Sequence, residues 1–270
     1  MNEIVIVPSY KREELLWLCL EAIRREDANI RIVVFSDRGA GSGELSECVL
    51  NWVARLIIRP NHAHYGNSYN LLEACRWATR ELEEEFPPQI IHLIEDDTII
   101  HKGYFAWARE KLRFAPFPGY GPVYAAVCGR MGSSHISNWY ESPCASWNAD
   151  CLRQALTHVI PEYFGRTREE MQTVLDTKMF PNSRYKRGGA EQDGFFLRCI
   201  EAHGWKTLFP PKPLASHVGW WGYNCPPLRK GPAGTFEERI AACRMMLKNR
   251  DERIKLFGYD VTLKEMEAMR

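Results

Sequence analysis

Gln89-Ile90-Ile91-His92-Leu93-Ile94-Glu95-Asp96-Asp97 is the stretch that decides the fold. Its first six residues form an apolar run that is typical of a buried strand, and three consecutive acids follow at once. Carboxylates gathered at the edge of a core repel one another unless a cation or a hydrogen-bond network compensates them. Mg²⁺ and Mn²⁺ do so well, because they prefer oxygen ligands and keep coordination positions free for substrate phosphates. The triplet therefore predicts a metal site and a phosphate-bearing substrate.

The alternative for these three acids is the N-terminus of a helix, where carboxylates complement the helix dipole. Residues 98–103, Thr-Ile-Ile-His-Lys-Gly, delay any helix start after the triplet. The metal hypothesis is therefore the stronger of the two.

Short β-branched runs alternate with helical patterns in the first hundred residues, which is typical of strand and helix units that build a mostly parallel sheet. The expected strands are residues 4–7, 30–35, 55–58 and 89–94, and the expected helices are residues 13–25, 43–52 and 68–85. Ligands of open α/β sheets bind at the carboxyl ends of the strands. We therefore expect Pro8, Tyr10, Asp37 and the acidic triplet to share one edge of the sheet.

The pattern is looser after the triplet. The expected elements are helices over residues 104–113, 191–203 and 236–257 and strands over residues 123–128 and 205–208. Residues 160–187 have little periodicity and predict a surface insertion. The sequence thus predicts one α/β domain over residues 1–224, with a first half at 1–100 and a second at 101–224, and a helical extension over 225–270.

Composition excludes several classes of protein. A chain of 270 residues is long enough for one large domain, and its formal net charge of +1 gives no overall attraction to nucleic acid or membrane. Nine cysteines without a Cys-x-x-Cys pair argue against a disulfide framework and a zinc ribbon, and favour a reducing compartment. No apolar run approaches the ~18 residues of a membrane span. We expect a cytoplasmic protein without an integral membrane segment.

Asp37 is a second candidate for ligand binding. It follows an expected strand and precedes the glycine-rich residues 38–43, so it can accept a hydrogen bond from a base or a sugar. The alternative is an ordinary turn aspartate. The first strand is not followed by Gly-x-Gly-x-x-Gly, and the chain has no Walker lysine motif, which argues against a dinucleotide cofactor.

Glu191 and Asp193 open an amphipathic helix after two glycines, and a carboxylate there can act as a general base. The alternative is that they cap the helix. His217 lies in a loop with two glycines, where it either completes a metal site as a neutral imidazole or is a satisfied polar group. The nearby aromatic residues can stack on a sugar or a base, or can cap the core; they are Trp220, Trp221 and Tyr223.

Together these features resemble the GT-A glycosyltransferases of the family-2 type. The resemblance rests on Val7-Pro8-Ser9-Tyr10-Lys11-Arg12, Asp37, Asn61 with Gly66 and Asn70, Glu95-Asp96-Asp97, Glu191 with Asp193, and Ser216-His217. It covers residues 3–224. The fold that it implies is a Rossmann-like, mostly parallel central sheet flanked by helices, with a C-terminal acceptor-side region and a terminal helix.

The resemblance also implies roles. A nucleotide-sugar donor, with a UDP-sugar as the family's usual choice, would lie on the first half of the domain, and Mn²⁺ or Mg²⁺ would be held by Asp97 and His217. Asp193 matches the family's catalytic base for an inverting transfer, with Glu191 next in line. The donor-binding residues would be Pro8, Tyr10, Arg12, Asp37, Asn70, Glu95 and Asp96. A triplet that begins with Glu is similar to that of the animal N-acetylglucosaminyltransferases that initiate branched N-glycans.

The acceptor stays open. It can be the hydroxyl of a glycan or small molecule, a hydroxymethylated pyrimidine in DNA as in phage enzymes, or a protein. DNA would need a local basic patch; the candidates are Arg184, Lys186, Arg187, Arg229, Lys230, Arg244, Lys248, Arg250, Arg253 and Lys255, with acids interspersed among them. Two further alternatives are a sugar-nucleotide or carbohydrate-binding protein without turnover, and a nucleotidyltransferase, which usually has a glycine-rich basic N-terminal loop.

Overall fold

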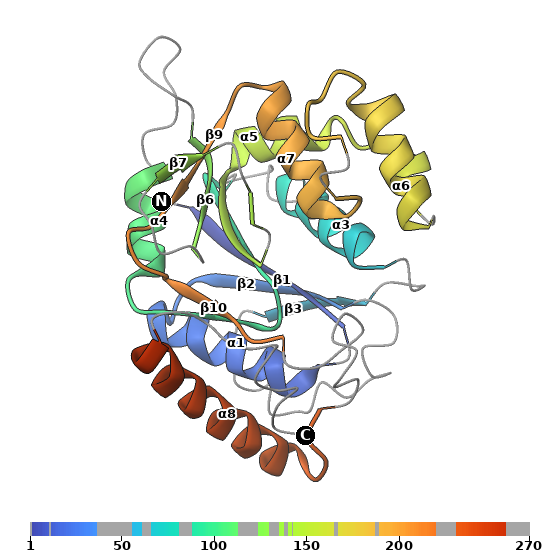
Figure 1. Ribbon diagram of the computed structural model, residues 1–270. Coiled ribbons are helices and arrows are strands. Elements are labelled where there is room, and N and C mark those ends of the chain that lie inside the picture. The colour runs from blue at the N-terminus through green and yellow to red at the C-terminus, as the bar shows by residue number, and fades with distance from the viewer. Residues whose placement is uncertain are drawn as a thin grey trace.

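The fold is α/β, as a computed structural model shows. The residues that it describes are 2–10, 12–36, 56–60, 66–80, 88–112, 124–129, 135–137, 140–141, 143–164, 167–186, 189–219 and 231–257. Within them an eight-stranded sheet lies between layers of helices (Figure 1). The predicted Rossmann-like, mostly parallel sheet flanked by helices is therefore confirmed.

The strands of this sheet lie in the order β3-β2-β1-β4-β8-β6-β9-β7. Their bounds are β1 Glu3–Ser9, β2 Arg31–Ser36, β3 Leu56–Pro60, β4 Ile90–Ile94, β6 Tyr124–Cys128, β7 His135–Ser137, β8 Cys144–Asn148 and β9 Lys206–Phe209. Neighbours β3, β2, β1 and β4 are parallel, and so are β6 and β9. Only β8 and β7 run against the others. The carboxyl ends of β1 and β4 therefore meet at one edge.

A second, two-stranded sheet pairs β5 (Thr98–Ile100) with β10 (Ala215–His217) in antiparallel register. Its register sets His217 opposite Thr98, directly after the acidic triplet. This small sheet brings the last third of the chain to the end of β4.

Both faces of the large sheet are buried, which explains why the central strands are mostly apolar. In β1, Ile4 and Ile6 belong to one core cluster, and Val5 and Val7 belong to the other. All four side chains are fully buried. Alternate residues of one strand thus fill the cores on the two sides of the sheet.

Helices cover these two faces unequally. The bounds are α1 Glu13–Glu26, α3 Asn67–Arg80, α4 Tyr104–Leu112, α5 Ala149–Leu156, α6 Arg168–Val174, α7 Gln192–Ala202 and α8 Phe236–Phe257. Residues of α3, α5 and α7 fill the larger core, whereas α1 and the start of α4 fill the other. The terminal helix α8 packs on the outside of α1, at the opposite end of the molecule from α6 (Figure 1).

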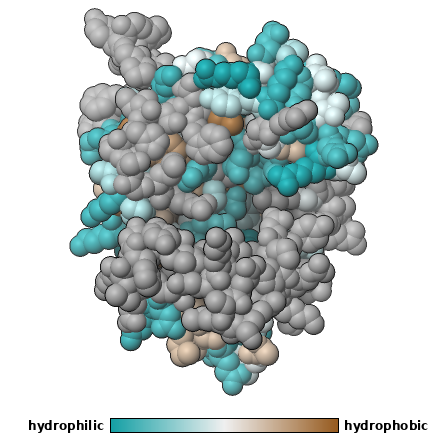
Figure 2. All heavy atoms as spheres, viewed as in Figure 1, coloured by the Kyte–Doolittle hydropathy of each residue, from teal (hydrophilic) through white to brown (hydrophobic). Residues whose placement is uncertain are grey.

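The described part of the segment between α5 and α7 contains regular elements and contributes to the core. It contains a 3-10 turn, Pro161–Tyr163, then α6 and a π-helical turn, Leu175–Met179. Tyr163 and Leu175 are fully buried in the larger core. The outer side of α6 is mainly hydrophilic (Figure 2).

Most of the long elements lie where the sequence predicted them. The predicted helix 43–52, residues 81–85 of another, Arg113, Val123, and the expected boundary at 224 and 225 lie outside the described residues. The cysteines of the described part are free and buried. No helix in these described ranges has the length and apolar character needed to cross a membrane.

Candidate active site

Asp96 is fixed where β1 and β4 end side by side. Only 1% of its surface is exposed, and its Oδ2 accepts hydrogen bonds from Ser9 Oγ at 2.9 Å and from the Tyr10 backbone N–H at 3.1 Å. Glu3 to Ile6 of β1 pair in parallel with Ile90 to Leu93 of β4, so the residues that follow each strand are neighbours. The predicted gathering of Tyr10 and the triplet at one sheet edge is what the structure has.

Arg12 compensates the charge of the triplet. Its guanidinium forms ion pairs with Asp96 Oδ1 and Asp97 Oδ2. Burial opposes the charge of Arg12, but the carboxylates of Asp96 and Asp97 raise its pKa well above the usual range. Burial likewise tends to raise the pKa of Asp97, and the positive charges of Arg12 and then His217 outweigh it and hold that pKa below its ordinary value. Asp97 is therefore ionised.

His217 meets the triplet from β10. Its Nε2 lies 3.1 Å from Asp97 Oδ1, and one ligand atom each from Glu95, Asp97 and His217 lie within 4.8 Å of one another. The next residue reinforces this contact, because the Val218 N–H donates to the Asp97 carbonyl at 2.6 Å. The metal-ligand hypothesis for His217 is thus favoured over that of an ordinary hydrogen-bonded histidine, because its ring lies near both Glu95 and Asp97.

Gly219 is required by the same close approach. A Cβ at this position would lie 2.9 Å from Asp97 Oδ2 and 3.3 Å from the His217 ring. Such distances are too short for a side chain unless Asp97 or His217 moves. The sequence analysis missed Gly219, although its place two residues after His217 was a signal for a tight backbone approach.

These three side chains fit a divalent cation. Asp97 Oδ1 is buried and receives no hydrogen bond of acceptable geometry, which is the state of an oxygen that a cation can use. Two carboxylates and one imidazole form a mixed oxygen and nitrogen set. Mn²⁺ accepts such a set more readily than Mg²⁺, which strongly prefers oxygen.

Glu95 connects this cluster to the start of α7. Burial, together with the charges of Asp97 and Asp193, raises the pKa of Glu95 to about 7, although the charges of His217 and Arg12 oppose the shift. The charge of Asp193 therefore acts at the triplet, and the two predicted acidic clusters lie near each other.

Glu191 and Asp193 have different surroundings. Asp193 lies in the first turn of α7 and is exposed. Glu191 is the N-cap residue, yet its side chain makes no capping hydrogen bond and instead lies 3.2 Å from Arg168 Nε. The capping alternative thus fails for Glu191, whose carboxylate faces an arginine of α6.

The predicted nucleoside-binding residues are only partly described. Pro8 lies in β1 opposite Phe35, and Asn70 is 2% exposed with its Nδ2 donating to the Phe35 carbonyl at 3.0 Å. The side chain of Asn70 in α3 is thus hydrogen-bonded to the backbone at the end of β2. Asp37, two residues beyond Phe35, and Trp220, Trp221 and Tyr223 lie outside the described residues.

The described basic residues do not form one patch. Arg184 Nε lies 3.0 Å from Glu201 Oε1 of α7, and Arg244 of α8 lies 2.7 Å from Glu21 of α1. Helices α7 and α8 cover opposite faces of the sheet (Figure 1). Arg187, Arg229 and Lys230, and the side chains of Arg250, Arg253 and Lys255, lie outside the described part of the chain.

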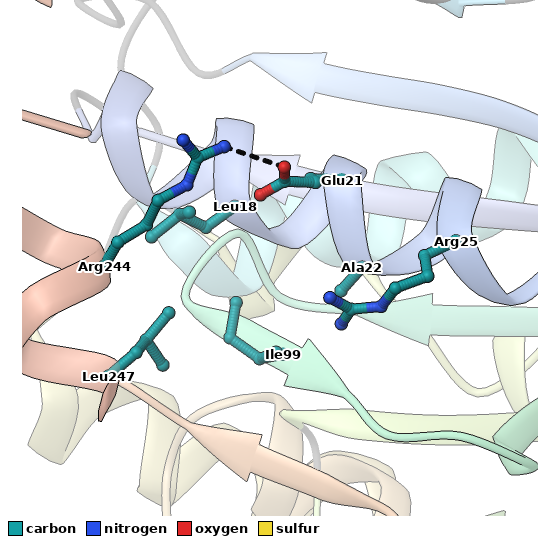
Figure 3. A pocket seen from close by; sticks show the side chains of 7 residues that line it. All are labelled: Leu18, Glu21, Ala22, Arg25, Ile99, Arg244 and Leu247. Carbon is teal, nitrogen blue, oxygen red and sulfur yellow. Dashed lines mark hydrogen bonds and ion pairs between the residues drawn. The ribbon is translucent and has the colours of Figure 1, made fainter. Parts of the chain in front are cut away.

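A cavity of about 290 Å³ lies between α1, β5 and α8 (Figure 3), and no residue of the acidic triplet lines it. Leu18, Ile99 and Leu247 form its apolar walls, and the ion pair of Arg244 with Glu21 crosses one side. None of the predicted catalytic, donor-binding or metal-binding residues lines it. We therefore place the active-site candidate at the triplet and not in this cavity.

Comparisons with known proteins give the family and the fold of this chain. The family model described as glycosyltransferase-like family 2 matches residues 3–240. The crystal structure of S. aureus TarS 1–349 is 11% identical with a TM-score of 0.50, over 80% of this chain and 60% of that one. The same TarS fragment in complex with UDP-GlcNAc is 12% identical with a TM-score of 0.53, over 81% and 61%.

This chain spans about three fifths of the length of those TarS chains. At such identities the likeness shows the fold alone, and it confirms the GT-A fold that the sequence predicted. No curated protein sequence matches the chain.

Proposed function

The chain belongs to the glycosyltransferase family 2-like proteins and is a glycosyltransferase, and from that premise we propose that it transfers a sugar from a nucleoside diphosphate sugar to an acceptor hydroxyl. Family membership supports this function over that of a nucleotidyltransferase or a non-catalytic binding protein. One observation carries the proposal: one ligand atom each of Glu95, Asp97 and His217 lie within 4.8 Å of one another.

We assign the cation to Asp97 and His217, with Glu95 as a further ligand in reach. A bound Mn²⁺ would act as a Lewis acid that neutralises charge on the departing diphosphate. Arg12 keeps Asp97 ionised and ready to bind the ion. Ser9 and the Tyr10 N–H hold Asp96 in place, so that the donor-binding residues at the end of β1 stay aligned with the triplet.

Asp193 is the proposed base. Its carboxylate would take the proton of the acceptor hydroxyl while that oxygen attacks the anomeric carbon from the face opposite the diphosphate. A bond from the acceptor oxygen to the anomeric carbon forms, and the bond from that carbon to the phosphate oxygen breaks, with its electron pair leaving on the diphosphate. Such an in-line displacement inverts the anomeric configuration.

The donor we favour carries UDP, and the acceptor we favour is the hydroxyl of a glycan or small molecule. The complex of TarS with UDP-GlcNAc supports the first choice by similarity of fold. The second follows from the basic residues, because Arg184 and Arg244 each have an acidic partner and lie on opposite faces of the sheet. A DNA acceptor is thus the less favoured alternative.

The proposal is tested by incubating the protein with a panel of nucleotide sugars, with and without Mn²⁺. Mass spectrometry would follow nucleoside diphosphate release and the gain of a sugar on glycans and on hydroxymethylated duplex DNA. We expect Mn²⁺-dependent release from a UDP-sugar and a mass gain on a glycan only. A gain on the DNA would replace the acceptor proposal, and no release from any donor would contradict the donor proposal.

The base is tested by comparing Asp193→Asn with Glu191→Gln. The first substitution removes the proton acceptor and keeps its shape, so we expect a transfer rate lower by ~10² or more with donor affinity unchanged. Glu191→Gln is a matched control two residues away, whose carboxylate faces Arg168, and it should retain most of the rate. The opposite ranking of the two variants would move the base to Glu191.

A further inference from the structure

Arg198 is a fully buried arginine in the middle of α7. Its neighbours Phe195, Phe196, Leu197, Cys199 and Ile200 are all buried and apolar. Burying a guanidinium is strongly unfavourable unless charge and hydrogen bonds compensate it. A role for this side chain must therefore be sought in its contacts.

The guanidinium of Arg198 joins two separate parts of the chain. Its Nε and Nη2 donate to Asp176 Oδ1 at 3.2 and 2.8 Å, which is an ion pair with the π-helical turn. Its Nη1 donates to two backbone carbonyls, those of Gly194 at 2.7 Å and Gly189 at 3.2 Å. Lysine has no planar fork that could make these contacts together.

The backbone between those two carbonyls is folded tightly. Gly189 has a φ of +106°, which favours glycine, and a Cβ on Gly194 would lie 2.0 Å from the Gly189 carbonyl oxygen. Residues 189 and 194 thus touch through their backbones. Asp193, the proposed base, is the residue directly before Gly194.

Two further hydrogen bonds hold the same segment. The Tyr163 hydroxyl donates to the Ala190 carbonyl at 2.6 Å, and Ser68 Oγ donates to Gln192 Oε1 at 3.0 Å. Gln192 is buried, whereas Asp193 next to it is exposed. The segment is thus held by contacts with buried residues, while the carboxylate of Asp193 is exposed to solvent.

We propose that Arg198 is a positioning residue that holds residues 189–194, and through them Asp193, in the place where the base can reach the acceptor hydroxyl. The inference rests on the proposed function, because it assumes that Asp193 is the base. Proton transfer needs a heavy-atom separation of about 2.6–3.2 Å, and a displacement of about 1 Å can lower a rate ~10²-fold. The buried ion pair with Asp176 keeps the guanidinium itself from moving.

The test compares the double variant Arg198→Met with Asp176→Leu against the wild type. Replacing both partners of a buried ion pair by apolar side chains often leaves stability unchanged, whereas Arg198→Met alone would leave Asp176 without its partner. Glu201→Gln is the matched control, because Glu201 lies near the end of α7 and contacts Ser183 and Arg184 instead of residues 189–194.

The first readout is amide hydrogen exchange, which needs no substrate. We expect exchange at least ~10-fold faster in residues 189–194 of the double variant, with α5 and the Glu201→Gln control unchanged. Unaltered exchange in residues 189–194, or a uniform increase along the whole chain, would overturn the proposal.

The second readout is the rate of UDP release from UDP-GlcNAc with Mn²⁺, measured in the double variant, in Asp193→Asn and in the triple variant that combines them. If Arg198 acts through Asp193, the double variant loses ~10² in kcat with an unchanged donor KM, and the triple variant is no slower than Asp193→Asn. Additive losses would mean that Arg198 is merely structural. A wild-type rate for Asp193→Asn would instead show that the base assignment itself has failed.

Discussion

At Gly219 the backbone passes so close to Asp97 that a single methyl group would disturb the proposed cation ligands. A Cβ there would lie 2.9 Å from Asp97 Oδ2, on a carboxylate that is only 3% exposed and already paired with Arg12. Side chains around metal ligands typically change metal affinity 10–100-fold when they are altered. The short distance to Asp97 is therefore the reason why position 219 requires glycine.

We predict that Gly219→Ala lowers the affinity for Mn²⁺ by about 10-fold or more, because the added methyl group displaces Asp97 or His217. Isothermal titration calorimetry of the purified protein with Mn²⁺ measures this, with Asp97→Asn as the reference for complete loss. The matched control is Gly204→Ala, since Gly204 has open space around it and a φ of +66°. That variant should lose some stability and keep its Mn²⁺ affinity; equal affinities in the two variants would contradict the prediction.

Sequence alone located the acidic residues but not all of the groups that hold them. Glu95, Asp97, Asp193 and His217 were identified because acids after a strand and a histidine among glycines are unusual patterns. Arg198 was missed, although one charged residue within an apolar helix face is a signal of a buried ion pair. Its partner Asp176 lies in a different segment, and no local pattern specifies that contact.

On the scale of single elements, β4 contains one polar residue that links three strands. His92 is fully buried, with Nδ1 at 2.6 Å from Ser146 Oγ in β8 and Nε2 at 3.1 Å from Glu3 Oε2 in β1. Burial lowers the pKa of His92 below 6.5, although Glu3 opposes this effect. The neutral imidazole is therefore the form that the fold favours.

This lowered pKa predicts a stability that depends on pH. Below pH 6.5 the unfolded chain takes up a proton on His92 before the folded chain does, so stability falls with acidification, by at most ~1.4 kcal/mol per pH unit. Urea unfolding of the wild type and of His92→Gln between pH 8 and pH 5 measures the effect. The difference between the two proteins should change below pH 6.5 and stay constant above it; a constant difference throughout would contradict the assignment.

The same scale shows which elements a sequence pattern can reveal. Helices α1, α7 and α8 and strands β1 and β4 are long enough for periodicity to mark them, and they were predicted within a residue or two. Strands β5, β7 and β10 have three residues each, which is too few for a period to be recognised. The positions of these strands depend on pairing with strands that are distant in the sequence. Pairing with β5 is what holds β10 next to the acidic triplet.

On the scale of the whole molecule, the terminal helix α8 packs against a residue that adjoins the active-site candidate. Val218 follows His217 and is fully buried in a cluster with Leu15 and Leu18 of α1 and Ile240 and Cys243 of α8. Its N–H donates to the Asp97 carbonyl. Packing at the outer surface of α1 is thus continuous with the proposed cation ligands.

We predict that Ile240→Ala lowers the free energy of unfolding by ~2 kcal/mol or more, because it leaves a cavity in this cluster. The matched control is Met245→Ala on the same helix, since Met245 is 68% exposed and its loss should change stability by no more than ~0.5 kcal/mol. Chemical denaturation of the two variants measures both values. Equal effects would mean that α8 does not pack on α1 as described.

The pairing of β5 with β10 has a consequence for the newly made chain. A ribosome releases Arg12 first, then the acids that follow β4, and His217 only after all the described strands of the larger sheet, because β10 follows β9 in the sequence. A nascent chain that has not yet reached β10 therefore carries the triplet with an arginine as its counter-ion and without its imidazole. The cation site is completed after translation has passed residue 217, when most of the larger sheet has already emerged.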